Sequence, residues 1–218
     1  MTNKHNDNYV NYYPSISILT PSYNQGDYIE ENILSVLNQN YPKFEHIIID
    51  GGSTDNTVNV LKKYTHLKWV SERDRGQADA LNKGLSMATG DIIGWINSDD
   101  YYEKNIFNSV AAAFSNKETQ WVIGNIIYLY NDTKDSQKKI SPNVTYENLL
   151  KNPDIVKQPA TFFRKSALEI VGGWNPALYM VMDYDLWLRM SRLSAPLMVN
   201  NNWAYFRMHG DQKSSFKN

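Results

Sequence analysis

The segment SISILTPSYNQG, residues 15–26, decides the fold of this 218-residue chain. It opens with an apolar run over residues 16–20 and passes at once into polar residues. Three runs of the same kind follow at residues 46–50, 68–71 and 92–96. Such short apolar runs are typical of parallel strands that are covered on both faces. Because parallel strands need crossover helices, the pattern predicts an α/β fold.

Two stretches between these runs have the period of amphipathic helices. Their apolar residues are Ile29, Ile33, Val36 and Leu37 in the first stretch and Ala78, Leu81, Leu85 and Ala88 in the second. A helix with one apolar stripe packs that stripe on its sheet. We therefore predict a single Rossmann-like domain, with a mixed but mainly parallel sheet flanked by helices.

After residue 96 the alternation of predicted strands and helices is less regular. The pattern there predicts helices at residues 104–114 and 183–194, strands at 121–129, 160–164, 197–199 and 204–208, and an exposed loop at 131–143. Residues 1–14 open with a polar, Asn-rich stretch and are expected to form a flexible arm. Residues 15–218 are expected to form one domain.

The composition limits the classes of function. The net charge of -1 gives no support for nucleic acid as a partner. No cysteine is present, so disulfides and thiolate metal sites are excluded. No apolar run approaches the roughly 20 residues of a membrane-spanning helix. We expect a cytoplasmic protein, and the aromatic and basic residues at the C-terminal end are compatible with peripheral contact at the inner face of a membrane.

Polar side chains follow the predicted strands, where open parallel sheets bind their ligands. Asp99 and Asp100 are adjacent carboxylates that repel each other unless a cation lies between them. Oxygen ligands of this kind suit Mg²⁺ or Mn²⁺ bound to a diphosphate. The alternative is that the pair only caps the next helix and turn.

Three other residues near the strand ends have two interpretations each. Tyr23 is either a packing residue or a ring that stacks on a nucleobase. Asp50 is either a turn residue or an acceptor for a base or a ribose hydroxyl. Arg75 is either a solvated charge or a contact to phosphate or base, because its guanidinium donates in a fixed geometry.

Together these segments resemble the family-2 glycosyltransferases of the GT-A fold. The matching stretches are SILTPSYN at residues 17–24, IDGGSTD at 49–55, GDIIGWINSDD at 90–100 and MDYDLWLR at 182–189. The resemblance implies an inverting enzyme that moves a sugar from a nucleoside-diphosphate donor, UDP-linked, to an acceptor hydroxyl. It also implies a nucleotide-binding half at residues 15–100 and an acceptor and catalytic-base half at residues 101–218.

The resemblance assigns binding roles to the residues already discussed. Thr20, Pro21 and Tyr23 would line the nucleobase pocket, with Asp50 reading the base or ribose and Arg75 close by. Asn97 and Asp99 would contact the donor, with Mn²⁺ or Mg²⁺ held by Asp99 or Asp100. His209 is either a further ligand of the metal or diphosphate or a surface or packing residue. Asn97 departs from the family pattern, in which this position is acidic, and is expected to accept a hydrogen bond from a ribose hydroxyl.

By the same resemblance Asp183 is the general base. Met182 precedes it where Glu is common in the family. Asp185 lies four residues before Arg189, and this spacing predicts an ion pair on a helix face rather than a catalytic role. Trp174, in a Gly-Gly-Trp turn, either stacks on an acceptor sugar or is a buried packing residue.

The acceptor stays open between a glycan, a lipid-linked saccharide and another hydroxyl compound. Surface glycan or glycoconjugate biosynthesis is the expected context, and the oligomeric state is not predicted. Two alternatives remain. A sugar nucleotidyltransferase would also use such a sheet, but residues 20–26 lack the basic phosphate loop it needs. An inactive nucleotide-sugar-binding module is favoured by Asn97 and Met182.

Overall fold

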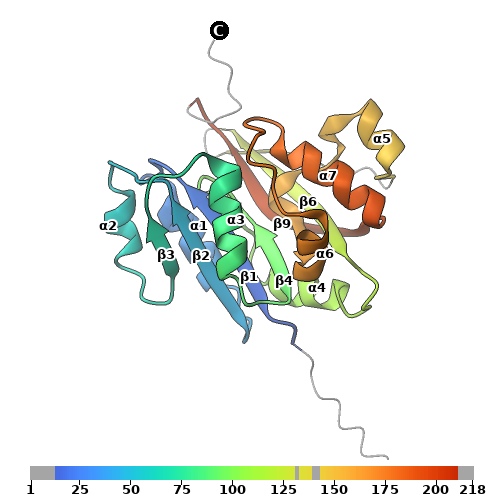
Figure 1. Cartoon of the computed structure of the whole chain (residues 1–218). Coiled ribbons are helices and arrows are strands. Elements are labelled where there is room, and N and C mark those ends of the chain that lie inside the picture. The colour runs from blue at the N-terminus through green and yellow to red at the C-terminus, as the bar shows by residue number, and fades with distance from the viewer. Residues whose placement is uncertain (1–12, 131–132, 139–142, 211–218) are drawn as a thin grey trace, which may run out of the picture.

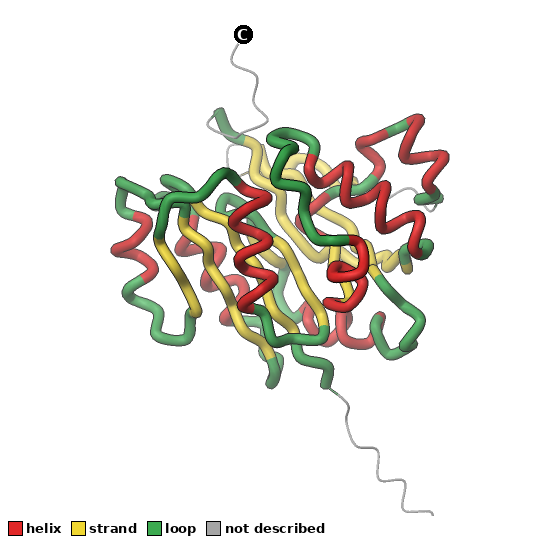
Figure 2. The backbone as a smooth tube through the Cα atoms, viewed as in Figure 1, coloured by secondary structure: helices red, strands yellow, loops and turns green. Residues whose placement is uncertain are grey.

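The computed structural model describes residues 13–130, 133–138 and 143–210. A nine-stranded sheet forms its centre, in the order β3-β2-β1-β4-β8-β6-β9-β5, with β7 beside β6 (Figures 1 and 2). The strands are β1 (Ile16–Ser22), β2 (Phe44–Asp50), β3 (Lys68–Ser71), β4 (Ile92–Trp95), β5 (Tyr101–Tyr102), β6 (Trp121–Tyr130), β7 (Thr133–Lys138), β8 (Thr161–Arg164) and β9 (Leu197–Met208).

Seven α-helices and two short 3₁₀ helices accompany these strands in the described part of the chain. They are α1 (Ile29–Leu37), α2 (Thr57–Leu61), α3 (Gln77–Met87), α4 (Ile106–Ala113), α5 (Tyr146–Lys151), η1 (Pro153–Ile155), η2 (Gln158–Ala160), α6 (Lys165–Val171) and α7 (Met182–Leu193). Within the described residues, none of these helices is long and apolar enough to cross a membrane.

The first four strands pair in parallel, as the sequence predicts. β1 lies between β2 and β4, and β3 is on the outer side of β2. Every residue of β1 is buried, because helices cover both faces of this part of the sheet. The carboxyl ends of β1, β2 and β4 therefore meet at one edge, which is where the polar segments begin.

The second half of the sheet corrects two predictions. Over the whole sheet four strand pairs are parallel and four are antiparallel, so the sheet is mixed but parallel pairing predominates only in its first half. The predicted loop at 131–143 contains β7, which pairs antiparallel with β6. Residues 131–132 and 139–142 of that loop lie outside the described residues.

The two short strands predicted at 197–199 and 204–208 are a single strand, β9. Its polar centre, Asn200 to Asn202, has the composition of a turn. It stays in the sheet because the register against β6 shifts on either side of Asn125, which accommodates the extra residues as an irregularity.

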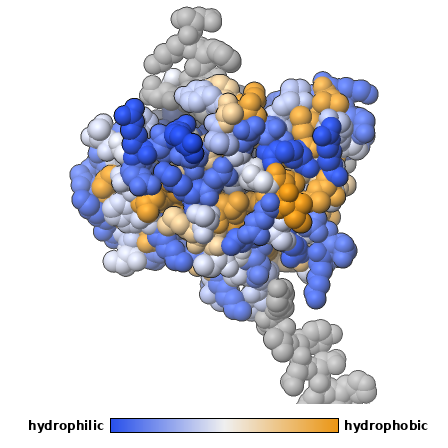
Figure 3. All heavy atoms as spheres, in the orientation of Figure 1, coloured by the Kyte–Doolittle hydropathy of each residue, from blue (hydrophilic) through white to orange (hydrophobic). Residues whose placement is uncertain are grey.

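Two apolar layers hold the helices to the sheet. On one face α3, α6 and α7 pack on Leu19, Ile49 and Trp95, and Figure 1 shows these three helices side by side on the viewer's side of the sheet. On the other face α1, α2 and α4 cover the strand residues that alternate with these, such as Ile18 and Ile48. In Figure 3 hydrophobic residues gather towards the side of α6 and α7.

Residues 13 and 14 of the predicted flexible arm pack on the domain. Tyr13 packs edge-on against Tyr41, with ring centroids 5.7 Å apart. The Tyr41 hydroxyl donates to the carbonyl of Pro14 at 2.7 Å. These contacts join residues 13 and 14 to the domain, while residues 1–12 lie outside the described part.

Candidate functional site

A cleft of about 740 Å³ opens at the edge where β1 and β4 end. It is lined from both halves of the chain. Its walls are formed by Pro21, Ser22, Tyr23, Gln25, Asp74, Gly76, Gln77, Ala80, Trp95, Asn97, Ser98, Asp99, Asp100, Tyr128, Pro153, Asp154, Val156, Lys157, Gln158, Pro159, Tyr179, Met180, Met182, Asp183, Phe206 and Met208. Five predicted site residues besides Tyr23 lie on this wall: Pro21, Asn97, Asp99, Asp100 and Asp183.

Helix α1 holds the loop that follows β4 through hydrogen bonds. Asn32, which is buried, donates its side-chain amide to the carbonyls of Asn97 and Asp100, both at 2.9 Å. The Asp100 amide also donates to the Asn97 carbonyl at 3.1 Å. These bonds close the loop into a fixed turn, so the two carboxylates are positioned before any ligand arrives.

Asp99 and His209 come together although they are 110 residues apart. The His209 Nε2 atom lies 3.2 Å from Asp99 Oδ2. Tyr28 stacks on the His209 ring, with centroids 4.6 Å apart. The His209 side chain is therefore fixed in orientation at the carboxylate.

This arrangement fits a divalent cation. The Asp99–His209 contact is a hydrogen bond at 3.2 Å, and this separation is also close to the roughly 3 Å between neighbouring ligand atoms of an octahedral ion with metal–oxygen distances near 2.1 Å. Asp100 Oδ2 is buried and makes no hydrogen bond in the described part of the chain. Burial, and then the charge of Asp99, raise the pKa of the Asp100 carboxyl well above its usual range. A nearby cation would favour the charged form of Asp100 and so oppose the effects of burial and of Asp99 on its pKa.

The cation would need further ligands from the nucleotide. Among the described residues no group of three or more His, Cys, Asp or Glu side chains is arranged to hold a metal by itself. Oxygens of a bound diphosphate would supply the remaining positions, as is usual for Mg²⁺ sites.

Arg207 is a residue of the site that the sequence analysis missed. It is buried, and its backbone amide donates to Asp100 Oδ1 at 2.9 Å. Its guanidinium donates to the Asp99 carbonyl at 2.7 Å and forms an ion pair with Glu31. Arg207 thus ties β9, α1 and the acidic loop together. Arg207 lies two residues before His209, which the sequence analysis names as a candidate ligand.

Tyr23 stands between two cavities. Its side chain is 60% exposed, which is unusual for a large aromatic residue at a strand end. Besides the main cleft it lines a second cavity of about 360 Å³, together with Gly51, Gly52, Arg73 and Asp74. An exposed aromatic ring on the wall of a cavity can stack on a base.

Thr20 and Asp50 are not in the cleft, which corrects their predicted positions. Thr20 is fully buried, and its hydroxyl lies 2.9 Å from His46 Nε2. Asp50 is also fully buried. Its carboxylate accepts hydrogen bonds from the amides of Gly52 and Ser53 and from the hydroxyls of Ser53 and Ser71. These local donors support the turn interpretation of Asp50.

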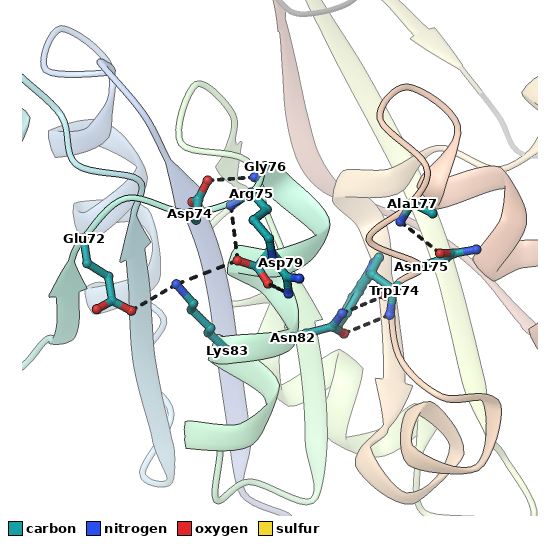
Figure 4. Close-up of polar contacts among 10 residues, drawn as sticks. All are labelled: Glu72, Asp74, Arg75, Gly76, Asp79, Asn82, Lys83, Trp174, Asn175 and Ala177. Carbon is teal, nitrogen blue, oxygen red and sulfur yellow. Dashed lines mark hydrogen bonds and ion pairs between the residues drawn. The ribbon is translucent and has the colours of Figure 1, made fainter.

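Arg75 points away from both cavities. Its guanidinium pairs with Asp79 at 2.6 Å, and the side chain is 78% exposed. Figure 4 shows Arg75 lying along α3 against Asp79. The neighbouring Arg73 lines the smaller cavity instead. The sequence does not distinguish Arg73 from Arg75, because the direction of each side chain depends on the path of the loop.

Asn97 is in the cleft, but not with the polarity expected from the sequence. Its Oδ1 atom accepts hydrogen bonds from Gln77 Nε2 at 2.7 Å and from Trp95 Nε1 at 3.0 Å. That oxygen is therefore occupied by protein donors. The predicted acceptance of a ribose hydroxyl is not supported by this geometry.

Asp183 lies in the first turn of α7 and faces the cleft. The apolar side of α7 packs in the core through Leu186 and Trp187, which fixes the helix. Asp185 pairs with Arg189 at 2.6 Å, so the predicted ion pair is confirmed. Met182 is buried and contributes to the same core.

Trp174 is a packing residue. It is fully buried and packs edge-on against Trp95 at 5.6 Å. The side chain of Asn82 in α3 accepts a hydrogen bond from the Trp174 backbone amide and donates one to the Trp174 carbonyl (Figure 4). A Cβ on Gly173 would lie 2.5 Å from Asn82 Oδ1, and φ is +65° there, so glycine is required at this close approach. The acceptor-stacking interpretation of Trp174 is wrong.

The exposed aromatic side chain on the Asp183 side of the cleft is Tyr179, at 68% exposure. Lys157, which pairs with Asp154, is the one basic residue on the cleft wall formed by the described residues. Neither residue lies in a recognised motif, so no local signal in the sequence identifies them.

Comparison with known proteins gives one family. The family model for glycosyl transferase family 2 matches residues 17–171. A protein named as a teichuronic acid biosynthesis glycosyltransferase, TuaG of Bacillus subtilis, is 33% identical over 151 residues, which are 66% of this chain and 60% of that protein. Hyaluronan synthase of Pasteurella multocida is 28% identical over 95% of this chain, but the match spans only 22% of the synthase.

Solved structures show the same fold. TarS of S. aureus in complex with UDP superposes with a TM-score of 0.74 at 22% identity, over 90% of this chain and 61% of TarS. The mannosyltransferase PcManGT of Pyrobaculum calidifontis, in complex with GDP-Man and Mn²⁺, gives a TM-score of 0.68 at 20% identity, over 94% and 59% of the two chains. The predicted mixed α/β sheet of the GT-A type is confirmed, and with the family model matching most of its length, the chain belongs to glycosyl transferase family 2.

Proposed function

We propose that this chain is the catalytic domain of an inverting glycosyltransferase that uses a UDP-linked sugar. One observation carries the proposal: a single cleft brings together Tyr23 after β1, Asp99 after β4 and Asp183 at the start of α7. These are a ring for the base, a carboxylate for the metal-bound diphosphate and a carboxylate for the acceptor.

Each side chain then has a separate task. Tyr23 orients the nucleotide by stacking on the base. The Asp183 carboxylate accepts the proton of the acceptor hydroxyl, whose oxygen attacks the anomeric carbon while the bond from that carbon to the diphosphate breaks. Attack from the face opposite the leaving group inverts the configuration. The cleft geometry supports this division of roles, because the two carboxylates come from different halves of the chain.

Asp99 and His209 are the proposed protein ligands of a divalent cation, Mn²⁺ or Mg²⁺, with Asp100 as the adjacent carboxylate. When bound, the cation supplies positive charge that stabilises the leaving diphosphate. The presence of Mn²⁺ in the PcManGT complex supports this proposal by likeness of fold.

The acceptor is proposed to be a hydroxyl compound of surface glycan biosynthesis, a glycan or a lipid-linked saccharide. The names of TuaG and hyaluronan synthase support this context. Tyr179 lies on the Asp183 side of the cleft, where its exposed ring suits a sugar. A cytoplasmic location, with contact at the inner face of the membrane, stays a prediction.

Donor hydrolysis tests the proposal. The chain is incubated with a panel of UDP- and GDP-sugars and Mn²⁺, and free sugar, nucleoside diphosphate and pyrophosphate are measured. Slow release of sugar and nucleoside diphosphate supports a glycosyltransferase. Consumption or release of pyrophosphate would instead identify a nucleotidyltransferase. Donor binding without any turnover, even with a panel of glycan acceptors, would identify an inactive binding module.

A further inference from the structure

Helix α3 holds the segment between α6 and α7 at two points of one residue. Asn82 Oδ1 accepts a hydrogen bond from the Trp174 backbone amide at 3.0 Å, and Asn82 Nδ2 donates to the Trp174 carbonyl at 2.6 Å (Figure 4). Because a backbone amide only donates and a carbonyl only accepts, the two bonds fix the orientation of the Asn82 side chain. One side chain thus satisfies both backbone groups of a residue 92 positions away in the sequence.

Trp174 is a fixed point close to the cleft. Its ring is fully buried and packs edge-on against Trp95, the last residue of β4. Trp95 itself lines the cleft. The Asn82 contact therefore acts on a residue that lies directly behind the cleft wall.

Residues 175–181 run from Trp174 to α7 without helix or strand. Tyr179, Met180 and Val181 follow one another in this segment, and all three side chains are exposed. A segment with exposed side chains makes few packing contacts, so its position depends mainly on its two ends. One end is Trp174, and the other is the first turn of α7, whose apolar side packs in the core.

We propose that Asn82 is a positioning residue for the acceptor side of the cleft, where it holds Trp174 and thereby fixes residues 175–181. Tyr179 and Met180 line the cleft, as does Asp183 in the first turn of α7. Asn82 is not among the described residues that form the cleft wall, so it acts through Trp174. The inference rests on the proposed function, which places the acceptor on this side, and extends it to a residue outside the cleft.

The nucleotide side of the cleft is held by other contacts. Asn32 of α1 donates to two carbonyls of the loop at residues 97–100, and Tyr23 follows β1, which is paired on both sides. Asp183 is carried by α7, which the core fixes independently of Asn82. Loss of the Asn82 contact should therefore affect the acceptor side while the nucleotide side and the base keep their positions.

Hydrogen–deuterium exchange followed by mass spectrometry tests the positioning on the chain without ligands. Asn82→Ala removes both bonds, and amides of residues 175–181 should exchange about 5- to 30-fold faster, as expected for the loss of one or two hydrogen bonds. Peptides that cover residues 97–100 should exchange as in the wild type. The matched control is Ser86→Ala, an exposed position of the same helix, which should leave both regions unchanged.

A second variant covers the case in which Asn82→Ala does not fold. Asn82→Asp keeps an acceptor for the Trp174 amide but has no donor for the Trp174 carbonyl, and its charge repels that oxygen. It should also speed the exchange of residues 175–181. Circular dichroism checks the folding of each variant.

Kinetics separate positioning from a general loss of structure. In Asn82→Ala the Kd for UDP with Mg²⁺ and the rate of donor hydrolysis without acceptor should stay within about two-fold of the wild type, because water needs no acceptor site. The KM for the glycan that the wild-type chain uses best from the acceptor panel should rise by about 5- to 30-fold. A merely structural role would instead reduce the fraction of folded protein, and with it nucleotide-binding capacity and both rates together.

Three results would overturn the inference. They are unchanged exchange of residues 175–181 in the folded variants, exchange that rises equally at residues 97–100, and UDP binding that weakens as much as the acceptor KM rises. A wild-type chain that neither binds nor hydrolyses a donor would overturn the proposed function. The exchange measurement would then still decide whether Asn82 fixes the segment, so the two failures are distinguishable.

Discussion

At the scale of single residues, exposure separates the side chain proposed to bind the nucleotide from the structural ones. Tyr23 is 60% exposed, whereas Thr20 and Asp50 are fully buried in the same region. Thr20 and Tyr23 belong to one sequence motif and Asp50 to the next, and only the structure shows that Tyr23 is the one of the three on the cleft wall. Asp50 shapes the loop beside Tyr23 through Ser53, whose hydroxyl donates to Asp50 and accepts a hydrogen bond from the Asn24 amide.

Replacement of Tyr23 tests its proposed stacking role. Tyr23→Ala should weaken UDP binding by about 1–3 kcal/mol, the range for base–aromatic stacking. Tyr23→Phe keeps the ring and should change the affinity little. Isothermal titration calorimetry measures both variants. Equal losses for the two would indicate a hydroxyl contact in place of stacking.

The proposed roles of Asp183 and Asp185 differ, and matched substitutions separate them. Asp183→Asn keeps size and polarity but removes the proton acceptor, so transfer should fall by about 10²–10⁴-fold while donor affinity is retained. Asp185→Asn only weakens the ion pair with Arg189 and should be much milder. Initial rates of transfer and donor binding are compared for both. Loss of transfer in Asp185→Asn alone would show that the base is assigned to the wrong residue.

At the scale of elements, the side chain of Glu45 in β2 links β1, β3 and the residues before β4. It lies at the end of the sheet opposite the cleft. It accepts hydrogen bonds from Ser17 of β1, at 2.5 Å, and from Thr89, which precedes β4. It also pairs with Lys68 of β3 at 2.5 Å. Burial by itself would raise the pKa of Glu45, but the hydrogen bonds from Lys68, Ser17 and Thr89 outweigh it and lower the pKa to about 2.

This pKa makes the contribution of Glu45 to stability depend on pH. Since the folded-state pKa lies below the usual value of 4.5 for a glutamate, the stabilisation is present above about pH 4.5 and is lost as the pH falls towards 2. Glu45→Gln should lower the free energy of unfolding by about 1–2 kcal/mol at pH 7, with a difference that shrinks below pH 4.5. Urea denaturation across this pH range measures it. Glu118→Gln, an exposed control, should show no such difference, and a Glu45 effect independent of pH would contradict the ionic origin.

The elements differ in how well the sequence predicts them. β1, β2 and β4 are apolar runs buried on both faces, and α1 and α3 have one apolar stripe, so local pattern is sufficient for them. β7 has a polar sequence, TKDSQK, and is stabilised by pairing with β6, which no local pattern reveals. α5 and α6 are only six and seven residues long, too short for a clear period.

The residues of the candidate site also divide into those that a sequence motif identifies and those that only the structure identifies. Tyr23, Asp99 and Asp183 belong to motifs that the family resemblance identifies, and they line the cleft. The path of the loop after β3 brings Arg73 to the smaller cavity, and the pairing of β9 brings Arg207 to the acidic loop. Only the structure identifies these two residues. Long-range packing decides which of several polar residues in a motif faces the ligand.

At the scale of the whole molecule, the cleft joins the two halves of the chain. Tyr23 and Asp99 come from the first half, and Asp183 and His209 from the second. A nucleotide and a cation bound there would contact both halves. Because unfolding would separate these contacts, ligand binding should stabilise the whole domain.

Thermal unfolding therefore tests the cation and the nucleotide together. At UDP concentrations about 100-fold above Kd with Mg²⁺, stability should rise by about 2.7 kcal/mol, which corresponds to about 5–11 °C in Tm for a domain of this size. EDTA should abolish most of the shift, because the diphosphate would then face Asp99 and Asp100 without a neutralising charge. Asp99→Ala and His209→Ala should each reduce the shift in Mg²⁺, whereas Asp185→Asn should retain it. If UDP raises Tm equally in EDTA and in Mg²⁺, the nucleotide binds without the cation, and Asp99 and His209 are not its ligands.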